Sequence, residues 1–496
     1  MKVREKKVEK MTLNKDTKII LVGAGVFGLS NALHLAKNGY NNVTVFDRLD
    51  FEANHYTLLE GADTASADMN KIFRAQYAEK KHYQDLAFQS YEIWQEWERE
   101  IDLLPQSEVK KYTDLQLLDL CGMLRLDDQV GWEELESRKN FAKEGLASLR
   151  FDINNNLDVK RAKYQGYGAK IQFALDLKSK IPTLEGVLDS SSGILYASRC
   201  LQYAAYLCKS MGVNFILGGD KGTFKEYIMS DKQTVSGIVT MDGKKHEAKL
   251  VVVNCGPWST SLVPELDGIN EATGGNILMC KIPKDRKDLK VKYSSKNFPI
   301  VCWKSGHSRE REYLAGMFLF PVLEPEGFLK IIVRQTKYTN PQKLENGRVV
   351  SIPKTSNSSP PFTSLPQHIV HQVKRWLQLF FPDLVSLKWE SRILWYTDTI
   401  NNDYIYDFVP NKIGLFVACG GSGHAFKMLP VLGQFLVDKV EGRENLYTKL
   451  FAWRYAKDFE KDPNGLKEGL NGPRVYKNQL ISCPEDYEFD KERPLL

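Results

Sequence analysis

A glycine-rich turn near the start of the chain limits the possible folds more than any other feature. Residues 18–25, KIILVGAG, form an apolar run without polar alternation, which is typical of a strand covered on both faces. Gly23, Gly25 and Gly28 follow in a Gly-x-Gly-x-x-Gly spacing and open a helical pattern, and a second short apolar run ends at Asp47. The segment therefore predicts a β-turn-α-β unit of a doubly wound α/β domain.

The same turn predicts a dinucleotide site. The glycines let the chain turn tightly and let a pyrophosphate approach the backbone, and the helix that begins with Val26 and Phe27 supplies N–H groups and the positive end of its dipole. Asp47 stands nineteen residues after Gly28 and can accept hydrogen bonds from ribose hydroxyls. This fingerprint alone does not separate FAD from NAD.

A second glycine turn, Cys419–Lys427, lies between an apolar strand and a helical segment near the other end of the chain. Small residues at a helix start offer free N–H groups to an electron-rich acceptor, and the C2 carbonyl of a flavin would suit them. This turn favours FAD over NAD, while an ordinary turn with a surface lysine is the alternative. The candidate cofactor contacts are Gly421, Ser422, Gly423, His424 and Lys427.

A third candidate lies in the long loop that follows the second strand. This loop is too long for an ordinary connection and is expected to be functional. It ends in ADMNKIFRAQY, where Lys71 and Arg74 stand three residues apart. On one face of a helix such a basic pair would suit a carboxylate or a phosphate ligand, and a solvated charged face is the alternative.

Strand-turn-helix patterns at both ends predict a nucleotide-binding domain assembled from separated segments, with a second domain inserted between them. The predicted FAD-binding segments are 17–100, 190–265 and 385–450, the predicted substrate domain comprises 101–189 and 266–384, residues 1–16 form a solvated tail and 451–496 a C-terminal extension.

Composition narrows the class of protein further. The net charge of +6 is too small for 496 residues to argue for nucleic acid. No apolar run is long enough for a transmembrane helix, so no membrane association is expected. The eight cysteines are scattered without a C-x-x-C pair, which predicts reduced thiols of an intracellular protein and no metal site. The charged first eighteen residues resemble neither a secretory signal nor a mitochondrial presequence.

Several blocks together carry a family resemblance over nearly the whole chain. They are VGAGVFGLSNALHL, ADMNKIFRAQY, VVVNCGPWS, KYS followed by FP, and RILWYTDT with VACGGSGHAFK. In these blocks the chain resembles the monomeric sarcosine oxidase family of flavoproteins, especially its fungal fructosyl-amino-acid, L-pipecolate and L-saccharopine oxidases. The resemblance implies a glutathione-reductase-like FAD-binding Rossmann domain with an inserted α+β substrate domain built on a mixed sheet.

The resemblance also implies an activity. Members oxidise the C–N bond of a secondary amino acid to an imine, and dioxygen is reduced to hydrogen peroxide. Arg74 stands three residues after Lys71, a spacing that favours L-saccharopine or L-pipecolate as substrate. A fructosyl-amino-acid oxidase, or a flavin or NAD dehydrogenase that does not use O2, is the alternative. The expected partners are the amino-acid substrate and O2, and a monomer is expected.

By position, the resemblance assigns roles to individual residues. Arg74 and Lys427 match the residues that bind the substrate carboxylate, as a fork and a point charge. Lys292, in the VKYS segment, matches a lysine placed near flavin N5 to activate oxygen, where a fixed cation stabilises superoxide. Asn70 and Lys71 match positions near the flavin.

Two departures from the family pattern carry further expectations. Tyr396 matches a tyrosine beside the flavin ring, but the position where several members carry a flavin-linked cysteine is Leu394, so FAD is expected to be held without a covalent bond. The chain ends in Arg-Pro-Leu-Leu where many peroxisomal members end in a Ser-Lys-Leu-type tripeptide, and a cytoplasmic location is expected.

Overall fold

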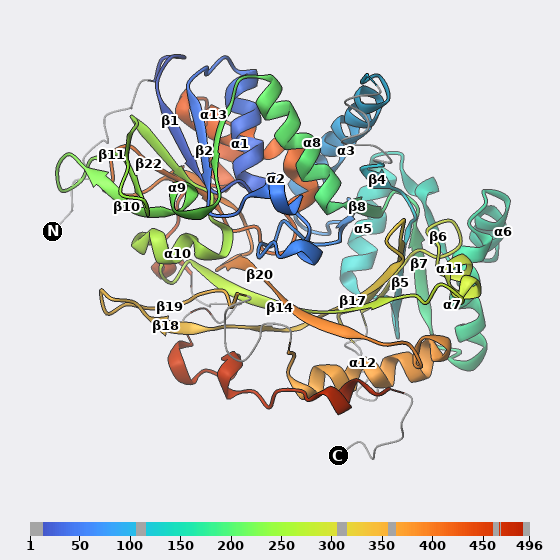
Figure 1. The fold of residues 1–496 in the computed structure, drawn as a ribbon. Coiled ribbons are helices and arrows are strands. Elements are labelled where there is room, and N and C mark those ends of the chain that lie inside the picture. Colours follow the sequence, from blue (N-terminus) through green and yellow to red (C-terminus); the bar gives the residue numbers. More distant parts are fainter. Residues whose placement is uncertain are drawn as a thin grey trace. The chain divides into compact units, whose positions relative to one another are not determined.

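A computed structural model describes residues 13–105, 116–304, 315–355, 364–459, 466 and 468–489 (Figure 1). Most of the expected N-terminal tail and the C-terminal Arg-Pro-Leu-Leu lie outside these residues. The chain divides into two compact units, each made of three segments. Unit 1 comprises Met1–Ala67, Cys200–Ala272 and Tyr396–Lys467, and unit 2 comprises Asp68–Arg199, Thr273–Trp395 and Glu468–Leu496.

Unit 1 is built on a six-stranded sheet in the order β21-β22-β13-β1-β2-β9. Its strands pair in parallel except β21, which is antiparallel to β22. They are β1 (Ile19–Val22), β2 (Val43–Asp47), β9 (Asn214–Leu217), β13 (Leu250–Val253), β21 (Ile405–Phe408) and β22 (Leu415–Cys419). A second sheet holds β10 (Phe224–Met229), β11 (Val235–Thr240) and β12 (Lys245–Glu247). The helices are α1 (Val26–Lys37), α2 (Phe51–Asn54), α8 (Ala197–Ser210, in unit 1 from Cys200 on), α9 (Gly219–Gly222), α10 (Ser259–Leu262), α13 (Leu429–Val440) and α14 (Leu446–Leu450).

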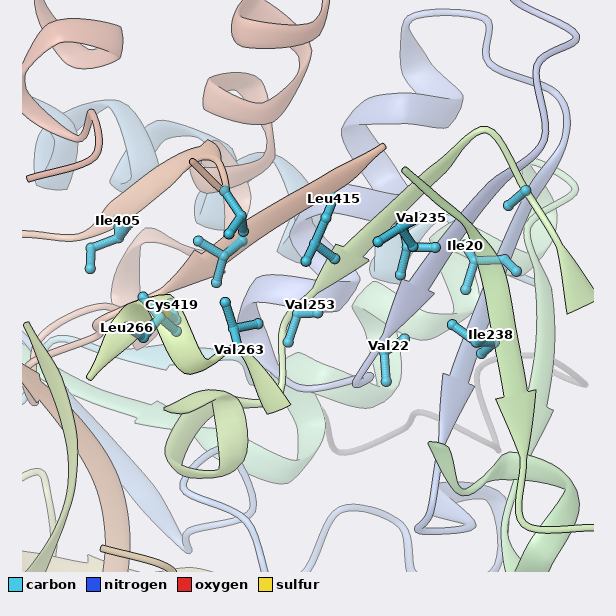
Figure 2. Close-up of a cluster of buried hydrophobic side chains, with 14 of the residues drawn as sticks. Ile20, Val22, Val235, Ile238, Val253, Val263, Leu266, Ile405, Leu415 and Cys419 are labelled. Carbon is cyan, nitrogen blue, oxygen red and sulfur yellow. The ribbon is translucent and has the colours of Figure 1, made fainter. Parts of the chain in front are cut away.

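Apolar side chains fill both faces of the parallel sheet. All four residues of β1 are buried, as the unbroken apolar run predicts. Ile20 and Val22 point to one face, where Figure 2 shows them in a cluster with Val253 and with Ile238 of β11. Helices α1 and α13 both contact strands of this sheet as well as each other. The sheet is therefore a covered central layer, which keeps its strand ends in fixed positions.

Helices α1 and α13 come from opposite ends of the chain and pack with their backbones close together. The Ser30 hydroxyl donates to the carbonyl of Leu429 at 2.5 Å and accepts the amide of Gly433 at 2.8 Å. A Cβ atom on Gly433 would lie 2.0 Å from the Ser30 carbonyl oxygen. The first and last segments of unit 1 are thus joined through a contact that only glycine allows.

Unit 2 is built on an eight-stranded mixed sheet in the order β20-β14-β17-β16-β15-β5-β7-β6. These strands are β5 (Met123–Asp127), β6 (Arg150–Asp152), β7 (Glu185–Asp189), β14 (Asn270–Lys281, in unit 2 from Thr273 on), β15 (Ile300–Trp303), β16 (Met317–Leu323), β17 (Phe328–Tyr338) and β20 (Glu390–Thr399, in unit 2 up to Trp395). The smaller sheets hold β3 (Asn70–Phe73), β4 (Leu118–Asp119) and β8 (Gly193–Tyr196), and β18 (Pro341–Lys343) and β19 (Val349–Ser351). The helices are α3 (Lys81–Asp102), α5 (Trp132–Lys143), α6 (Asn156–Tyr164), α7 (Gly168–Lys180), α11 (Lys287–Lys292) and α12 (Gln367–Phe380).

The unit boundaries differ from the predicted domain boundaries. Residues 68–100, 190–199 and 385–395, predicted in the FAD-binding domain, fall in unit 2, and residues 266–272, predicted in the substrate domain, fall in unit 1. In unit 2, β3 pairs with β8 in a three-stranded sheet. The expected C-terminal extension also divides between the units. Its later part packs on unit 2, where Thr339 bridges to Val475, and Tyr476 is buried. In the described residues no helix is both long and apolar enough to cross a membrane.

The contact between α1 and α13 predicts that Gly433→Ala destabilises unit 1. The new methyl group would meet the Ser30 carbonyl, and such overpacking lowers the free energy of unfolding by about 1–3 kcal/mol. Urea unfolding followed by circular dichroism measures it. Gly168→Ala is the matched control, because its Cβ would make only ordinary contacts from 3.4 Å outward, and a change within about 0.5 kcal/mol is expected there. Equal stability of the two variants would contradict the packing argument.

Candidate functional site

The first glycine turn follows β1 directly and passes very close to other backbone atoms. Gly23 has a φ of +99°, and a Cβ atom there would lie 2.7 Å from the carbonyl oxygen of Asn254. A Cβ atom on Gly28 would lie 1.8 Å from the Gly23 carbonyl oxygen. No larger residue fits either position without moving the backbone, so the local structure requires glycine at both Gly23 and Gly28.

The turn leaves backbone donors available at the start of α1. The amide of Val26 donates to the Ser66 hydroxyl at 3.0 Å. The amides of Phe27 and Gly28 have no acceptor among the described residues, since first-turn amides lack a carbonyl partner within the helix. Such donors at the positive end of a helix are suited to a pyrophosphate, and the glycines keep the approach to them open.

Asp47 ends β2 beside this turn. Its Oδ2 atom accepts the amide of Ala24 at 2.7 Å, and its Oδ1 atom accepts the amide of Leu49 at 2.8 Å. Burial raises the pKa of Asp47, and the two amide bonds act in the opposite direction. Each carboxylate oxygen keeps a further lone pair with which to accept a ribose hydroxyl. Together with the free amides of α1, Asp47 fits the adenosine and pyrophosphate end of FAD.

The second glycine turn differs from its prediction in one respect. Helix α13 begins at Leu429, and a 3-10 turn, Phe426–Met428, separates it from the small residues. Ser422 and Gly423 have φ values of +44° and +71°, which a right-handed helix cannot contain. The Ser422 hydroxyl accepts the amide of Thr399, and its own amide donates to the carbonyl of Thr397. The turn is therefore fixed against β20 and presents a loop, not a helix end.

Lys427 is a buried residue, which contradicts the alternative of a surface lysine. Only 3% of its surface is exposed, and its Nζ atom donates to the carbonyl of His424 at 2.9 Å. The His424 ring contacts the Tyr404 hydroxyl through Nδ1 and the Asn402 carbonyl through Nε2. A lysine held in this way keeps its position and can place a positive charge for a ligand of the turn.

The third candidate segment forms a strand, so its predicted helical face is wrong. Residues 70–73 are β3, paired with β8 from Asn70↔Tyr196 to Phe73↔Gly193. Side chains alternate along a strand, so Lys71 and Arg74 cannot form a pair on one face. The pattern of the residues suggested a helix because the pairing partner, β8, is far away in the sequence.

Lys71 takes part instead in a buried ion cluster that the sequence did not reveal. Its Nζ atom lies 2.8 Å from Oδ2 of Asp68, and the Nζ atom of Lys330 lies at the same distance from the same oxygen. Lys330 also donates to the carbonyl of Asn70 at 2.8 Å. Asp68 and Lys330 are each 1% exposed. Two lysines share one carboxylate, so the cluster of Asp68, Lys71 and Lys330 has a net positive charge.

Lys330 is the residue of this cluster whose protonation is most sensitive to pH. Burial lowers the pKa of Lys330 to about 8, although the charge of Asp68 opposes the shift. Burial would raise the pKa of Asp68, but the charges and hydrogen bonds of Lys330 and Lys71 lower it to about 2. One N–H of Lys330 has no acceptor among the described residues. A lysine inside the apolar run FLKIIV was the one sequence signal that pointed to it.

The other predicted catalytic residues lie in varied surroundings. Arg74 is half-buried, donates to the carbonyl of Gln76, and lies 4.7 Å from the centre of the Tyr77 ring. No carboxylate pairs with Arg74 among the described residues. Lys292 ends α11 with 59% of its side chain exposed, and its Nζ atom lies 2.7 Å from Asp383.

Tyr396 and Leu394 lie two residues apart on β20, and both are half-buried. Alternation along the strand places them on the same face. Their predicted relation to the flavin ring stays a prediction.

A parallel sheet with an open dinucleotide turn, joined to a unit with a mixed sheet, defines the class of two-unit flavin-dependent oxidoreductases. The chain belongs to the FAD dependent oxidoreductase family, DAO, whose model matches residues 18–439. It is 26% identical to L-saccharopine oxidase of Schizosaccharomyces pombe, over 89% of this chain and 93% of that protein. It is 23% identical to peroxisomal sarcosine oxidase of Mus musculus, over 84% and 90%.

Solved structures share the fold. Fructosamine oxidase from Aspergillus fumigatus, a deglycating enzyme, is 24% identical, with a TM-score of 0.71 over 97% of this chain and 100% of that one. A fructosyl peptide oxidase is 22% identical, with a TM-score of 0.70 over 89% and 94%. The predicted family, fold class, FAD cofactor and amine oxidase class are confirmed.

We predict that FAD is bound without a covalent link to a cysteine. A flavin–cysteine bond requires a thiolate, and Leu394 has none to offer. Burial raises the pKa of Cys419 and of Cys121 to about 12, so these thiols stay protonated. Acid precipitation of the holoprotein should leave free flavin in the supernatant and a colourless pellet. Leu394→Cys is the matched variant in which a covalent fraction could form. Flavin fluorescence that stays with the unmodified denatured chain would contradict the prediction.

Proposed function

We propose that this protein oxidises the C–N bond of a secondary amino acid with O2 as acceptor, and that L-saccharopine is its substrate. The relative named for that activity aligns over nearly the full length of both chains. FAD, when bound, takes two electrons from the substrate carbon and passes them to dioxygen. The products are an imine, which water hydrolyses, and hydrogen peroxide.

The observation that carries this proposal is the buried cation of Lys330. Dioxygen gains negative charge when it accepts an electron, and a fixed positive charge in a site without water stabilises that charge. Lys330 meets this requirement because Asp68 and the Asn70 carbonyl hold its Nζ atom and leave one N–H available. Lys292, which the resemblance assigned to this role, is exposed and paired with Asp383. We therefore propose Lys330 as the oxygen-activating residue.

Arg74 and Lys427 are proposed to bind the substrate carboxylate. Arg74 has no carboxylate partner among the described residues, so its fork is available for a ligand. Lys427 is buried and held by the His424 carbonyl, which limits its movement. A carboxylate fixed by two cations sets the orientation of the carbon that is oxidised. Asn70, Lys71 and Tyr396 are proposed to contact the flavin.

The role of Lys330 predicts a defect confined to one half-reaction. Lys330→Met keeps the length of the side chain and leaves Asp68 paired with Lys71. Reoxidation of the reduced enzyme by O2 should slow by about a hundredfold, while reduction by substrate changes little. In the unmodified enzyme the reoxidation rate should fall as pH rises through about 8, where Lys330 loses its proton, and this dependence should vanish in the variant.

Stopped-flow absorbance at several oxygen concentrations measures both half-reactions. Lys292→Met is the matched control, and a change within about twofold is expected for an exposed ion pair. The reverse result, a slow Lys292 variant and a normal Lys330 variant, would return the role to Lys292.

The substrate is tested by peroxide release. Purified holoprotein is assayed with L-saccharopine, L-pipecolate, sarcosine and a fructosyl amino acid at matched concentrations. The largest kcat/KM is expected for L-saccharopine. A larger value for the fructosyl amino acid would replace the proposed substrate, and flavin reduction without peroxide would identify a dehydrogenase instead of an oxidase.

A further inference from the structure

Lys330 and Arg334 lie on the same face of the eight-stranded sheet. In the ladder between β16 and β17, Lys330 of β17 pairs with Phe320 of β16. The Nζ atom of Lys330 lies 4.6 Å from the centre of the Phe320 ring. The ladder between β16 and β17 is regular from Lys330 to Val333, and the amide of Arg334 continues it by donating to Gly316. Side chains alternate along a strand, so this ladder places Arg334 on the face of Lys330. On its other side β17 pairs irregularly with β14 beyond Val333, but Ile332 and Arg334 are half-buried and Val333 between them is buried, as alternation requires.

The segment that carries Arg74 lies against this face. The Nζ atom of Lys330 donates hydrogen bonds to the side chain of Asp68 and to the carbonyl of Asn70, so the start of the segment is fixed against this face. Arg74 and Tyr77 follow a few residues later. Burial raises the pKa of Tyr77 to about 12, and the charges of both Arg74 and Arg334 oppose that rise. The Arg74 guanidinium lies 4.7 Å from the centre of the Tyr77 ring, and the charge of Arg334 acts on the same phenol.

A second buried group, the thiol of Cys302, lies on the same face. Cys302 pairs with Phe318, and Phe318 pairs with Ile332, so the Cys302 thiol points to the face of Lys330 and Arg334. Burial raises the pKa of the Cys302 thiol, and four positive charges oppose the shift. They belong to Lys304, Arg125, Arg74 and Arg334.

Among the residues that the structure describes, two of these four cations pair with a carboxylate. Glu133 lies 2.9 Å from Arg125 and 3.4 Å from Lys304. Arg74 and Arg334 are half-buried, and neither forms an ion pair with any described residue. Two neighbouring guanidinium groups repel each other in a partly buried place, and this repulsion is relieved when an anion binds. No described residue supplies such an anion here, so the two guanidinium groups are suited to an anionic ligand.

We propose that Arg334 binds a second carboxylate of the substrate, beside the carboxylate that Arg74 binds. The inference rests on the proposed function and narrows its substrate class to secondary amino acids with an additional acidic group. L-saccharopine, whose glutamate half carries two carboxylates, belongs to this class, whereas L-pipecolate and sarcosine carry one carboxylate each. A guanidinium fork accepts a carboxylate in two parallel hydrogen bonds, which makes Arg334 a selective residue.

The kinetic test compares substrates with and without the second carboxylate. Arg334→Gln should lower kcat/KM for L-saccharopine by about ten- to a hundredfold, mainly through KM, and should change kcat/KM for L-pipecolate by less than about twofold. Arg334→Lys should recover part of the loss. Lys304→Gln is the matched control, since Lys304 carries a charge on the same face but is paired with Glu133, and both substrates should react as in the unmodified enzyme.

A binding test separates this inference from the proposed activity. Glutarate reproduces the two carboxylates of the glutamate half, and butanoate has only one. Titration calorimetry on the oxidised holoprotein should show glutarate binding at least about tenfold more tightly than butanoate, and Arg334→Gln should abolish the difference.

Three results would overturn the inference. They are an equal loss for L-saccharopine and L-pipecolate, no loss for either, and no preference for glutarate in the unmodified protein. If Arg334-dependent glutarate binding is found but no secondary amino acid releases peroxide, the proposed function fails while the second carboxylate site is supported.

Discussion

One buried carboxylate joins the segment that carries Arg74 to the sheet of unit 2. Asp68 is the first residue of unit 2, and its Oδ2 atom holds both Lys71 and Lys330 at 2.8 Å. A buried lysine is tolerated only with a partner, because desolvation of an unpaired charge costs several kcal/mol. Asp68 therefore fixes the start of the segment that leads to Arg74 against β17.

Unit 1 depends on a different constraint, the meeting of strand ends. Parallel strands β13, β1 and β2 are neighbours, so their carboxyl ends lie along one edge of the sheet. Asn254 follows β13, Gly23 follows β1 and Asp47 ends β2, and the amide of Gly23 donates to the Phe46 carbonyl at 2.7 Å. Ligands of open α/β sheets bind at such an edge. Segments distant in sequence thereby contribute to one cofactor site.

The sequence predicted what depends on neighbouring residues and missed what depends on distant pairing. The unit from β1 to Asp47 was found because glycine spacing and apolar runs are local signals. The helical face of Lys71 and Arg74 was wrong because β8 converts that segment into a strand. Lys330 was overlooked because the sequence alone does not show burial. Most lysines are solvated, and only the fold brings Asp68 to this one.

Two cations on one face of β17, Lys330 and Arg334, have different proposed roles, one in the reaction and one in substrate recognition. Lys330 is paired within the protein with Asp68, so its position is fixed whether or not substrate is bound. Arg334, four residues further, has no carboxylate partner among the described residues. A folded chain can leave a half-buried guanidinium without a counter-charge if a ligand supplies that charge. A ligand that lacks the charge then binds more weakly. In the proposed mechanism, the internally paired cation Lys330 serves a step common to all substrates, whereas the unpaired cation Arg334 distinguishes between them.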